Sequence, residues 1–137
     1  MPSEKPSQKL EILFSVLVVM ILLEVAHFAV ISSQSNYIIN NALIFGTVGS
    51  NNWAIAISAI FIIIALFYVK KRHISPLALI FFFSGAATNL LDRYLHDGSV
   101  DYLRLSDWPV FNLPDVLIIS GLAIFLIEFL FFKNSNR

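Results

Sequence analysis

The side chains of this chain that could do chemistry gather in one stretch, residues 85–115. The stretch holds five of the nine acidic residues, with two asparagines and two arginines: Asp92, Asp97, Asp101, Asp107, Asp115, Asn89, Asn112, Arg93 and Arg104. Long apolar runs flank it on both sides. Carboxylates and amides at the edge of hydrocarbon are costly unless they are partnered or wetted, so this cluster is a candidate functional site.

Asp101 and Asp115 are the candidates for acid-base chemistry, because they come from different segments that could converge. Two carboxyl groups held close together cannot both ionise cheaply, so they share one proton. One member can then act as a base on water while the other acts as an acid, as in the aspartic peptidases. Spacing alone leaves open the alternative that both are ordinary surface charges.

The neighbouring polar residues also have structural interpretations. Asn89 suits a hydrogen bond at a helix end, and Asn112 suits the N-cap of the apolar run that follows it. Asp92 and Arg93 suit contacts with lipid head groups, although a guanidinium also suits a carboxylate. Their concentration in one patch favours a functional role, since structural polar residues would be scattered along the chain.

Other chemistries lack the residues they need. The chain has no cysteine, which excludes thiolate metal sites, disulfides and cysteine nucleophiles. No HExxH spacing, serine nucleophile motif or glycine-rich phosphate loop occurs. The one conceivable metal-ligand set is His27, His96, Asp101 and Asp115, and its spacing matches no metal motif. We therefore do not expect a metalloenzyme.

The composition is that of a polytopic membrane protein. Hydrophobic residues make up 58% of the 137 residues and charged residues 13%, whereas about a quarter of a soluble domain is charged. The mean hydropathy is +0.79. The formal net charge is zero, which argues against a nucleic-acid partner because such proteins carry a basic patch.

Four apolar runs are long enough to cross a bilayer, at about residues 12–31, 53–69, 74–91 and 113–132. They predict a single all-α membrane domain, residues 1–137, with four transmembrane helices. Residues 32–52 and the polar loop before the fourth run predict a small β-like region outside the membrane. Glu24 and His27 lie within the first run at i and i+3, so they share a helix face and suit either a helix contact or support of a polar site.

The basic residues predict the orientation. Seven of the nine lie at the N-terminus, between the second and third runs, or at the C-terminus: Lys5, Lys9, Lys70, Lys71, Arg72, Lys133 and Arg137. Basic residues favour the cytoplasmic side, and an even number of spans places these three segments together. We expect both termini in the cytoplasm and the acidic stretch outside it.

Four short blocks resemble the type II signal peptidases, which are the lipoprotein signal peptidases of bacteria. They are GAATNLLDR at 85–93, VDY at 100–102, FNLPD at 111–115 and NNALIF at 40–45. The blocks have the order and spacing of the family: NNALIF lies in the first external loop, and the other three lie between the third and fourth of four spans. The resemblance covers essentially the whole chain, although its specific content lies in these blocks.

The resemblance implies an aspartic endopeptidase of the bacterial inner membrane, with its active site on the extracytoplasmic side. Its substrates would be prolipoproteins that carry diacylglycerol on the cysteine after the cut, and it would act as a monomer without a cofactor. Asp101 and Asp115 would be the catalytic pair. The resemblance gives supporting or substrate-binding roles to Asn40, Asn89, Asp92, Arg93 and Asn112.

The chain departs from the family pattern at several positions. In the first span Glu24 takes the place of the family's Asp, and His27 is the nearest base to the usual Lys. Thr88, Pro114 and Ala42 replace a Gly, an Ala and a Gly. Two other function classes therefore stay open: a non-catalytic paralogue that binds lipoproteins or lipids, and a small proton-coupled transporter. A transporter predicts acids strung through the membrane depth, whereas these acids gather on one side.

Overall fold

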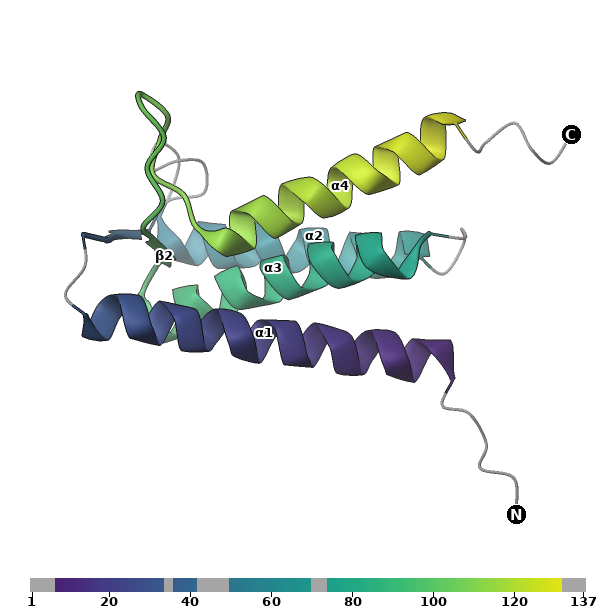
Figure 1. Ribbon diagram of the computed structural model, residues 1–137, viewed down its shortest axis with the longest axis horizontal. Coiled ribbons are helices and arrows are strands. Elements are labelled where there is room, and N and C mark those ends of the chain that lie inside the picture. Colours follow the sequence, from purple (N-terminus) through teal and green to yellow (C-terminus); the bar gives the residue numbers. More distant parts are fainter. Residues whose placement is uncertain (1–6, 34–35, 42–49, 70–73, 132–137) are drawn as a thin grey trace, which may run out of the picture.

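Four helices and two short strands make up the fold. The computed structural model describes residues 7–33, 36–41, 50–69 and 74–131. The helices are α1 (Gln8–Ser32), α2 (Asn51–Val69), α3 (Pro76–His96) and α4 (Leu113–Phe131), and the strands are β1 (Ile38–Asn40) and β2 (Ser99–Asp101). The helices run along the long axis of the molecule, and the strands lie together at one end of it (Figure 1).

Helix α3 is the central element. It packs against α1, α2 and α4, and its most extensive contact is with α4. Small residues on α3 and α4 allow this approach: a Cβ added to Gly121 would lie 2.8 Å from the Ala78 carbonyl oxygen. Small residues at helix contacts are typical of membrane proteins, where close backbone packing replaces the hydrophobic effect.

Local sequence sets the ends of α3. Ser75 is its N-cap, and the Ser75 hydroxyl accepts a hydrogen bond from the Ala78 N–H at 3.2 Å. Pro76 follows at the first helical position, where its missing N–H costs nothing. At the other end Asp97 adopts the left-handed conformation, with φ 58°, and turns the chain toward β2.

Burial is inverted relative to a soluble protein. The buried hydrophobic residues are few (Leu23, Ala54, Ala78 and Val100), while leucine, isoleucine and phenylalanine side chains lie exposed along all four helices. The buried polar residues outnumber them and include Asp92, Arg93, Asp101 and Asn112. An apolar exterior around a polar centre fits a protein surrounded by lipid.

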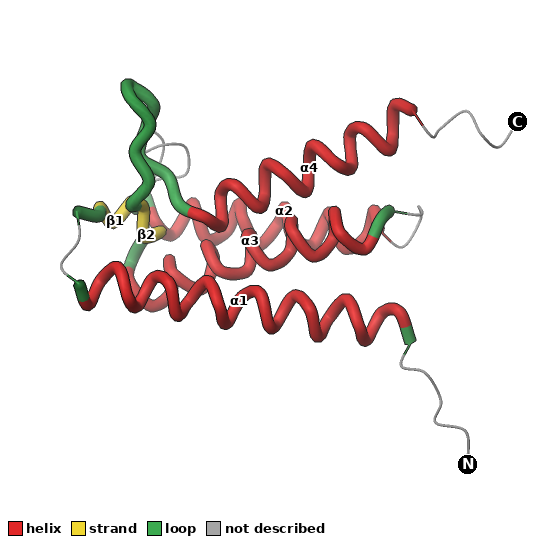
Figure 2. Tube along the Cα trace, in the orientation of Figure 1, coloured by secondary structure: helices red, strands yellow, loops and turns green. Residues whose placement is uncertain are grey.

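Strands β1 and β2 form a two-stranded antiparallel sheet (Figure 2). Ile38 pairs with Asp101 and Asn40 pairs with Ser99. Gly98 permits the close approach of the two strands, because a Cβ there would lie 2.8 Å from the Asn40 carbonyl oxygen. Beyond β2, the backbones of Leu103 and Phe111 bond to each other and close the loop that leads into α4.

The mostly helical fold predicted from the sequence is confirmed. Helices α1 and α4 are long and apolar enough to cross a membrane. Helix α3 continues past the predicted end of the third span at residue 91 to His96, with Asp92 and Arg93 buried and the last turn, from Tyr94 on, exposed. The predicted extended segments appear as β1 and β2, while residues 42–49, with the family-like Phe45 and the departure at Ala42, lie outside the described residues.

Candidate active site

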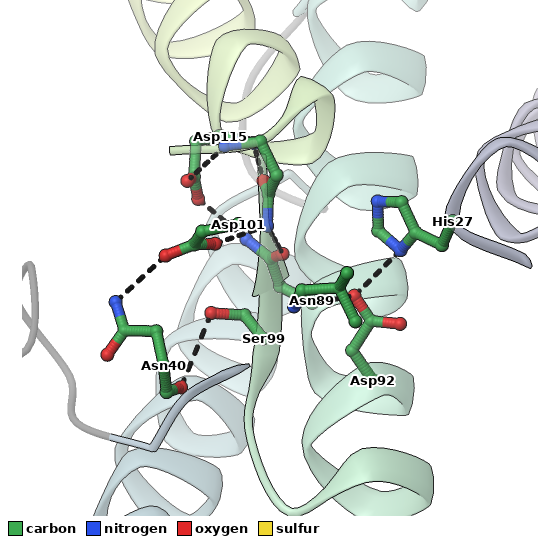
Figure 3. A network of polar contacts seen from close by, with 9 residues as sticks. His27, Asn40, Asn89, Asp92, Ser99, Asp101 and Asp115 are labelled. Carbon is green, nitrogen blue, oxygen red and sulfur yellow. Dashed lines mark hydrogen bonds and ion pairs between the residues drawn. The ribbon is translucent and has the colours of Figure 1, made fainter. Parts of the chain in front are cut away.

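Asp101 ends β2 and lies at the centre of a polar network. Its side chain is 2% exposed. The side-chain amide of Asn40, from the neighbouring strand, donates to Asp101 Oδ2 at 3.0 Å, and that of Asn112 donates to Oδ1 at 2.9 Å. Figure 3 shows the Asn40 amide directed at the carboxylate of Asp101. The register of the two strands therefore places an amide donor on Asp101.

Asp115 lies in the first turn of α4 and takes part in a reciprocal helix cap. The Asp115 N–H donates to Asn112 Oδ1 at 2.8 Å, and the Asn112 N–H donates to Asp115 Oδ2 at 3.1 Å. This is a capping box built from an asparagine and an aspartate. The other carboxylate oxygen, Oδ1, accepts from the Asn89 amide of α3 at 2.8 Å.

Two asparagine amides connect the carboxylates to each other. Asn112 Nδ2 donates both to Asp101 Oδ1 and to Asn89 Oδ1, each at 2.9 Å. Asn89 in turn donates to Asp115. The path Asp101–Asn112–Asn89–Asp115 fixes both carboxylates relative to α3 and to the start of α4.

Arg93 holds the first loop against α3. Its Nη1 donates to the Asn40 carbonyl oxygen at 3.2 Å and to Asn51 Oδ1 at 3.5 Å. Asn51, at the start of α2, donates to the Arg93 carbonyl oxygen at 2.9 Å and to Asp97 Oδ1 at 2.8 Å. The guanidinium thus positions the backbone of the residue whose side chain holds Asp101.

Asp92 faces the opposite side of α3, toward α1. Its Oδ2 lies 2.8 Å from His27 Nδ1, and both side chains are buried. The same oxygen accepts from the Val100 N–H in β2 at 3.4 Å. The edge of the His27 ring meets the ring of Tyr102, with centroids 5.5 Å apart. Both residues that flank Asp101 are therefore contacted by this α1–α3 pair.

The electrostatics of Asp101 favour a retained proton. Burial raises the pKa of Asp101 from 3.8 to about 6, against the opposing hydrogen bond from Asn40. The nearby Asp115 carboxylate acts in the same direction as burial, while Ser99 and Arg93 oppose it. A carboxyl group with this pKa can hold a proton where an exposed aspartate would have lost it.

A cavity of about 530 Å³ opens beside the two carboxylates. Its polar wall includes Asn40, Arg93, Asp101 and Asp115, and its apolar wall is formed by Leu105, Trp108, Phe111, Val116, Ile118 and Ile119. Few polar groups within an apolar lining are typical of ligand-binding pockets. The cavity suits an extended chain with apolar substituents.

The structure thus brings together Asn40, Asn89, Arg93, Asp101, Asn112 and Asp115, the residues singled out in the sequence, with Asp92 on the reverse side of α3. Arg104 and Asp107 are exposed in the loop. The four-residue metal-ligand set is not assembled among the described residues, where His27 groups with Glu24 and Asp92 instead.

Asn51 and Ser99 were not anticipated from the sequence. Ser99 donates to the Asn40 carbonyl oxygen at 3.5 Å and so joins the same network. Asn51 begins an apolar helix, where an asparagine is an ordinary helix-end residue, and only the fold shows that it contacts Arg93. The polar character of residues 50–52 was the one signal present in the sequence.

Comparison with known proteins gives a consistent family. Residues 8–131 match the family described as signal peptidase (SPase) II. The lipoprotein signal peptidase of Syntrophomonas wolfei is 37% identical over 95 residues, covering 66% of this chain and 64% of the relative. That of Clostridioides difficile is 33% identical over 107 residues, covering 74% and 72%. The matched stretch spans half of the Mycobacterium tuberculosis lipoprotein signal peptidase, which is 29% identical over 101 residues and 67% of this chain.

Solved structures share the fold. Two bacterial membrane enzymes determined by the in meso method superpose with TM-scores of 0.76 and 0.73. The first is 21% identical and covers 93% of this chain and 92% of the solved one. The second is 22% identical, with coverage of 88% and 93%. At these identities the likeness describes the arrangement of helices and strands.

Proposed function

The chain belongs to the signal peptidase II family, and from this premise we propose that it is an aspartic endopeptidase that removes signal peptides from prolipoproteins. The observation that carries the proposal is the pair Asp101 and Asp115, which hydrogen bonds of asparagine side chains connect beside a largely apolar cavity. The named relatives are lipoprotein signal peptidases. We propose that the substrates of this chain carry diacylglycerol on a cysteine and that the cut falls just before that cysteine.

In the proposed mechanism the two carboxyl groups share one proton. The ionised member takes a proton from water as the water oxygen attacks the scissile carbonyl carbon, and the protonated member gives its proton to the carbonyl oxygen. Collapse of the tetrahedral intermediate breaks the C–N bond: the first carboxyl group gives its proton to the leaving nitrogen, and the second carboxylate takes a proton back from a hydroxyl group of the intermediate as the carbonyl reforms. One water is consumed, and the dyad ends with the one proton it began with.

The amides have a positioning role in this proposal. Every carboxylate oxygen of the pair accepts a hydrogen bond from a side-chain or backbone amide. Donors of this kind stabilise the ionised form, while burial and the second carboxylate stabilise the protonated form of Asp101. Opposed influences of this kind suit a pair that must hold one proton between two sites.

The proposed placement of the chain in the membrane is based on the distribution of the basic residues and on the apolar helices. We propose four membrane-spanning helices in one domain, both termini in the cytoplasm, and the strands and active site at the outer face of the bacterial inner membrane. A lipid-anchored substrate would present its scissile bond at this depth. The exposed apolar helix surfaces fit a monomer surrounded by lipid.

The proposal is tested by cleavage of a purified prolipoprotein with and without the diacylglyceryl group. The full chain in detergent or lipid should cut the lipidated substrate, and mass spectrometry should find the modified cysteine at the new N-terminus. The unmodified substrate should be cut far more slowly. If a folded preparation cuts neither substrate across several signal sequences but still binds the lipidated substrate, the chain is a binding paralogue and the peptidase assignment is wrong.

A further inference from the structure

The contact between α1 and α3 holds a group of buried polar atoms without hydrogen-bond partners. Among the described residues these include Glu24 Oε1, His27 Nε2, Thr88 Oγ1 and Asp92 Oδ1. The side chains of His27, Thr88 and Asp92 are at most 1% exposed. Buried polar atoms in folded proteins are almost always satisfied by protein, by water or by an ion. The occurrence of several such atoms at one helix contact therefore indicates a bound water molecule or ion.

The donor atoms in this cluster lie close to one another. One ligand atom each from Glu24, His27 and Asp92 lies within 4.8 Å of the others. The His27 Nδ1 to Asp92 Oδ2 distance is 2.8 Å. Two ligands of a tetrahedral zinc ion lie about 3.3–3.6 Å apart, because each bond is about 2.0–2.2 Å long. Binding would therefore need His27 and Asp92 to separate slightly and the half-buried Glu24 side chain to rotate toward them.

Charge distinguishes an ion from a water molecule. Glu24 and Asp92 offer two carboxylates, whereas His27 supplies at most one positive charge. Arg93, the next residue on α3, donates to Asn40 and Asn51, and its positive charge also acts on Asp92. A water molecule would satisfy the hydrogen-bonding atoms, whereas a divalent ion would also bind both carboxylates directly.

We propose that Glu24, His27 and Asp92 bind a divalent first-row metal ion, with zinc as the best fit. An imidazole nitrogen with two carboxylates suits zinc and its neighbours, whereas calcium and magnesium prefer oxygen ligands alone. The site lies apart from the pair Asp101 and Asp115. Since Asp92 also accepts from the Val100 N–H, the ion would fasten α1 to both α3 and β2. This site is structural and departs from the metal-free chain expected from the sequence.

The test measures metal content of the full-length protein, purified in detergent without a polyhistidine tag. After equilibration with zinc sulfate and removal of free metal, the wild type should retain about one zinc per chain. His27→Gln and Glu24→Gln should each lose at least about tenfold of this content, because each removes a ligand. Glu11→Gln is the matched control, since Glu11 is exposed in the first turn of α1, far along the helix from Glu24, and should leave the content unchanged.

A second readout does not depend on stoichiometry. Zinc should raise the melting temperature of the wild type and of Glu11→Gln, since a ligand that binds the folded state stabilises it. It should not raise that of Glu24→Gln, which decides the question if His27→Gln does not fold. Zinc retention no higher in the wild type than in Glu24→Gln, or equal loss in Glu11→Gln, would overturn the proposal. Neither readout requires peptidase activity, so failure of the proposed function would not affect the result.

Discussion

At the scale of single residues, the proposed chemistry depends on how amides divide their hydrogen bonds between two carboxylates. Asn112 serves both: its side chain donates to Asp101, while its backbone N–H donates to Asp115. Asn40 serves Asp101 alone. The two amides therefore have separable effects, and Asn40 is the position at which the protonation of one carboxyl group can be changed without removing the helix cap.

Asn40→Ala should move the alkaline limb of the pH–activity profile to higher pH. The Asn40 hydrogen bond lowers the pKa of Asp101, which burial otherwise raises to about 6, so its removal lets that pKa rise further. The acid form then persists to higher pH. The measurement is kcat/KM against pH, which reports the free enzyme, and the control is Asn41→Ala at the exposed neighbouring residue. An alkaline limb that is unchanged or moves to lower pH would contradict the role given to Asn40.

The raised pKa of Asp101 also makes the stability of the folded chain depend on pH. In the folded chain Asp101 holds its proton up to about pH 6, whereas the ordinary value is 3.8. The folded state thus binds more protons between these values, and this contribution to stability is complete below 3.8 and is lost as the pH rises through about 6.

At the scale of elements, α3 supports every part of the site. One side of it carries Asn89 and Arg93 toward α4 and the first loop, and the other carries Asp92 toward α1. The i, i+3 and i+4 spacing of Asn89, Asp92 and Arg93 in the sequence predicted that all three lie on roughly one side of the helix, whereas Asp92 is directed to α1 and the other two to α4 and the first loop. It did not predict which partner each would take, because pairs such as His27 with Asp92 join elements far apart in the chain.

Gly85→Ala should lower turnover more than stability alone explains. An added Cβ at Gly85 would collide with the Pro114 carbonyl oxygen and lie 3.0 Å from Ile118 Cγ1. Such overpacking costs on the order of 1–3 kcal/mol. It also displaces the start of α4, which carries Asp115, and misplacement by about 1 Å can cost about 100-fold in rate.

The matched control is Gly121→Ala. Its added Cβ would lie 2.7 Å from the Phe82 backbone nitrogen, so it strains the same helix pair far along α4 from Asp115. Turnover per folded molecule should fall in Gly85→Ala and stay near wild type in Gly121→Ala. Equal losses in the two variants would mean that general packing of α3 and α4, not the position of Asp115, accounts for the effect.

At the scale of the whole molecule, composition predicted the fold class and could not predict the site geometry. Hydropathy and the spacing of apolar runs are local properties of the chain, and they indicated helices that the structure contains. The pairing of Asn40 with Ser99 across two strands depends on how the first loop folds back. Charges and turn residues in the sequence indicate that loop but do not fix its register. The orientation in the membrane stays a prediction from the basic residues.

Single cysteines can test the orientation, because the natural chain contains none. Asp107→Cys, in the exposed loop after β2, should react with a membrane-impermeant maleimide in bacterial cells whose outer barrier has been removed. Ser7→Cys, just before α1, should react only after the inner membrane is permeabilised. Labelling of Ser7→Cys from outside, or of Asp107→Cys only from inside, would contradict the proposed topology.

The most direct measurement is turnover of a lipidated prolipoprotein by Asp101→Asn and Asp115→Asn, compared with Asp107→Asn. The two buried carboxylates are joined through Asn112 and Asn89, whereas Asp107 is an exposed aspartate of the same loop. Each of the first two variants should fold and lose at least about 100-fold in turnover, since acid and base roles need both carboxyl groups. Asp107→Asn should keep the wild-type rate. Wild-type turnover by a folded Asp101→Asn or Asp115→Asn would show that this pair is not the catalytic dyad.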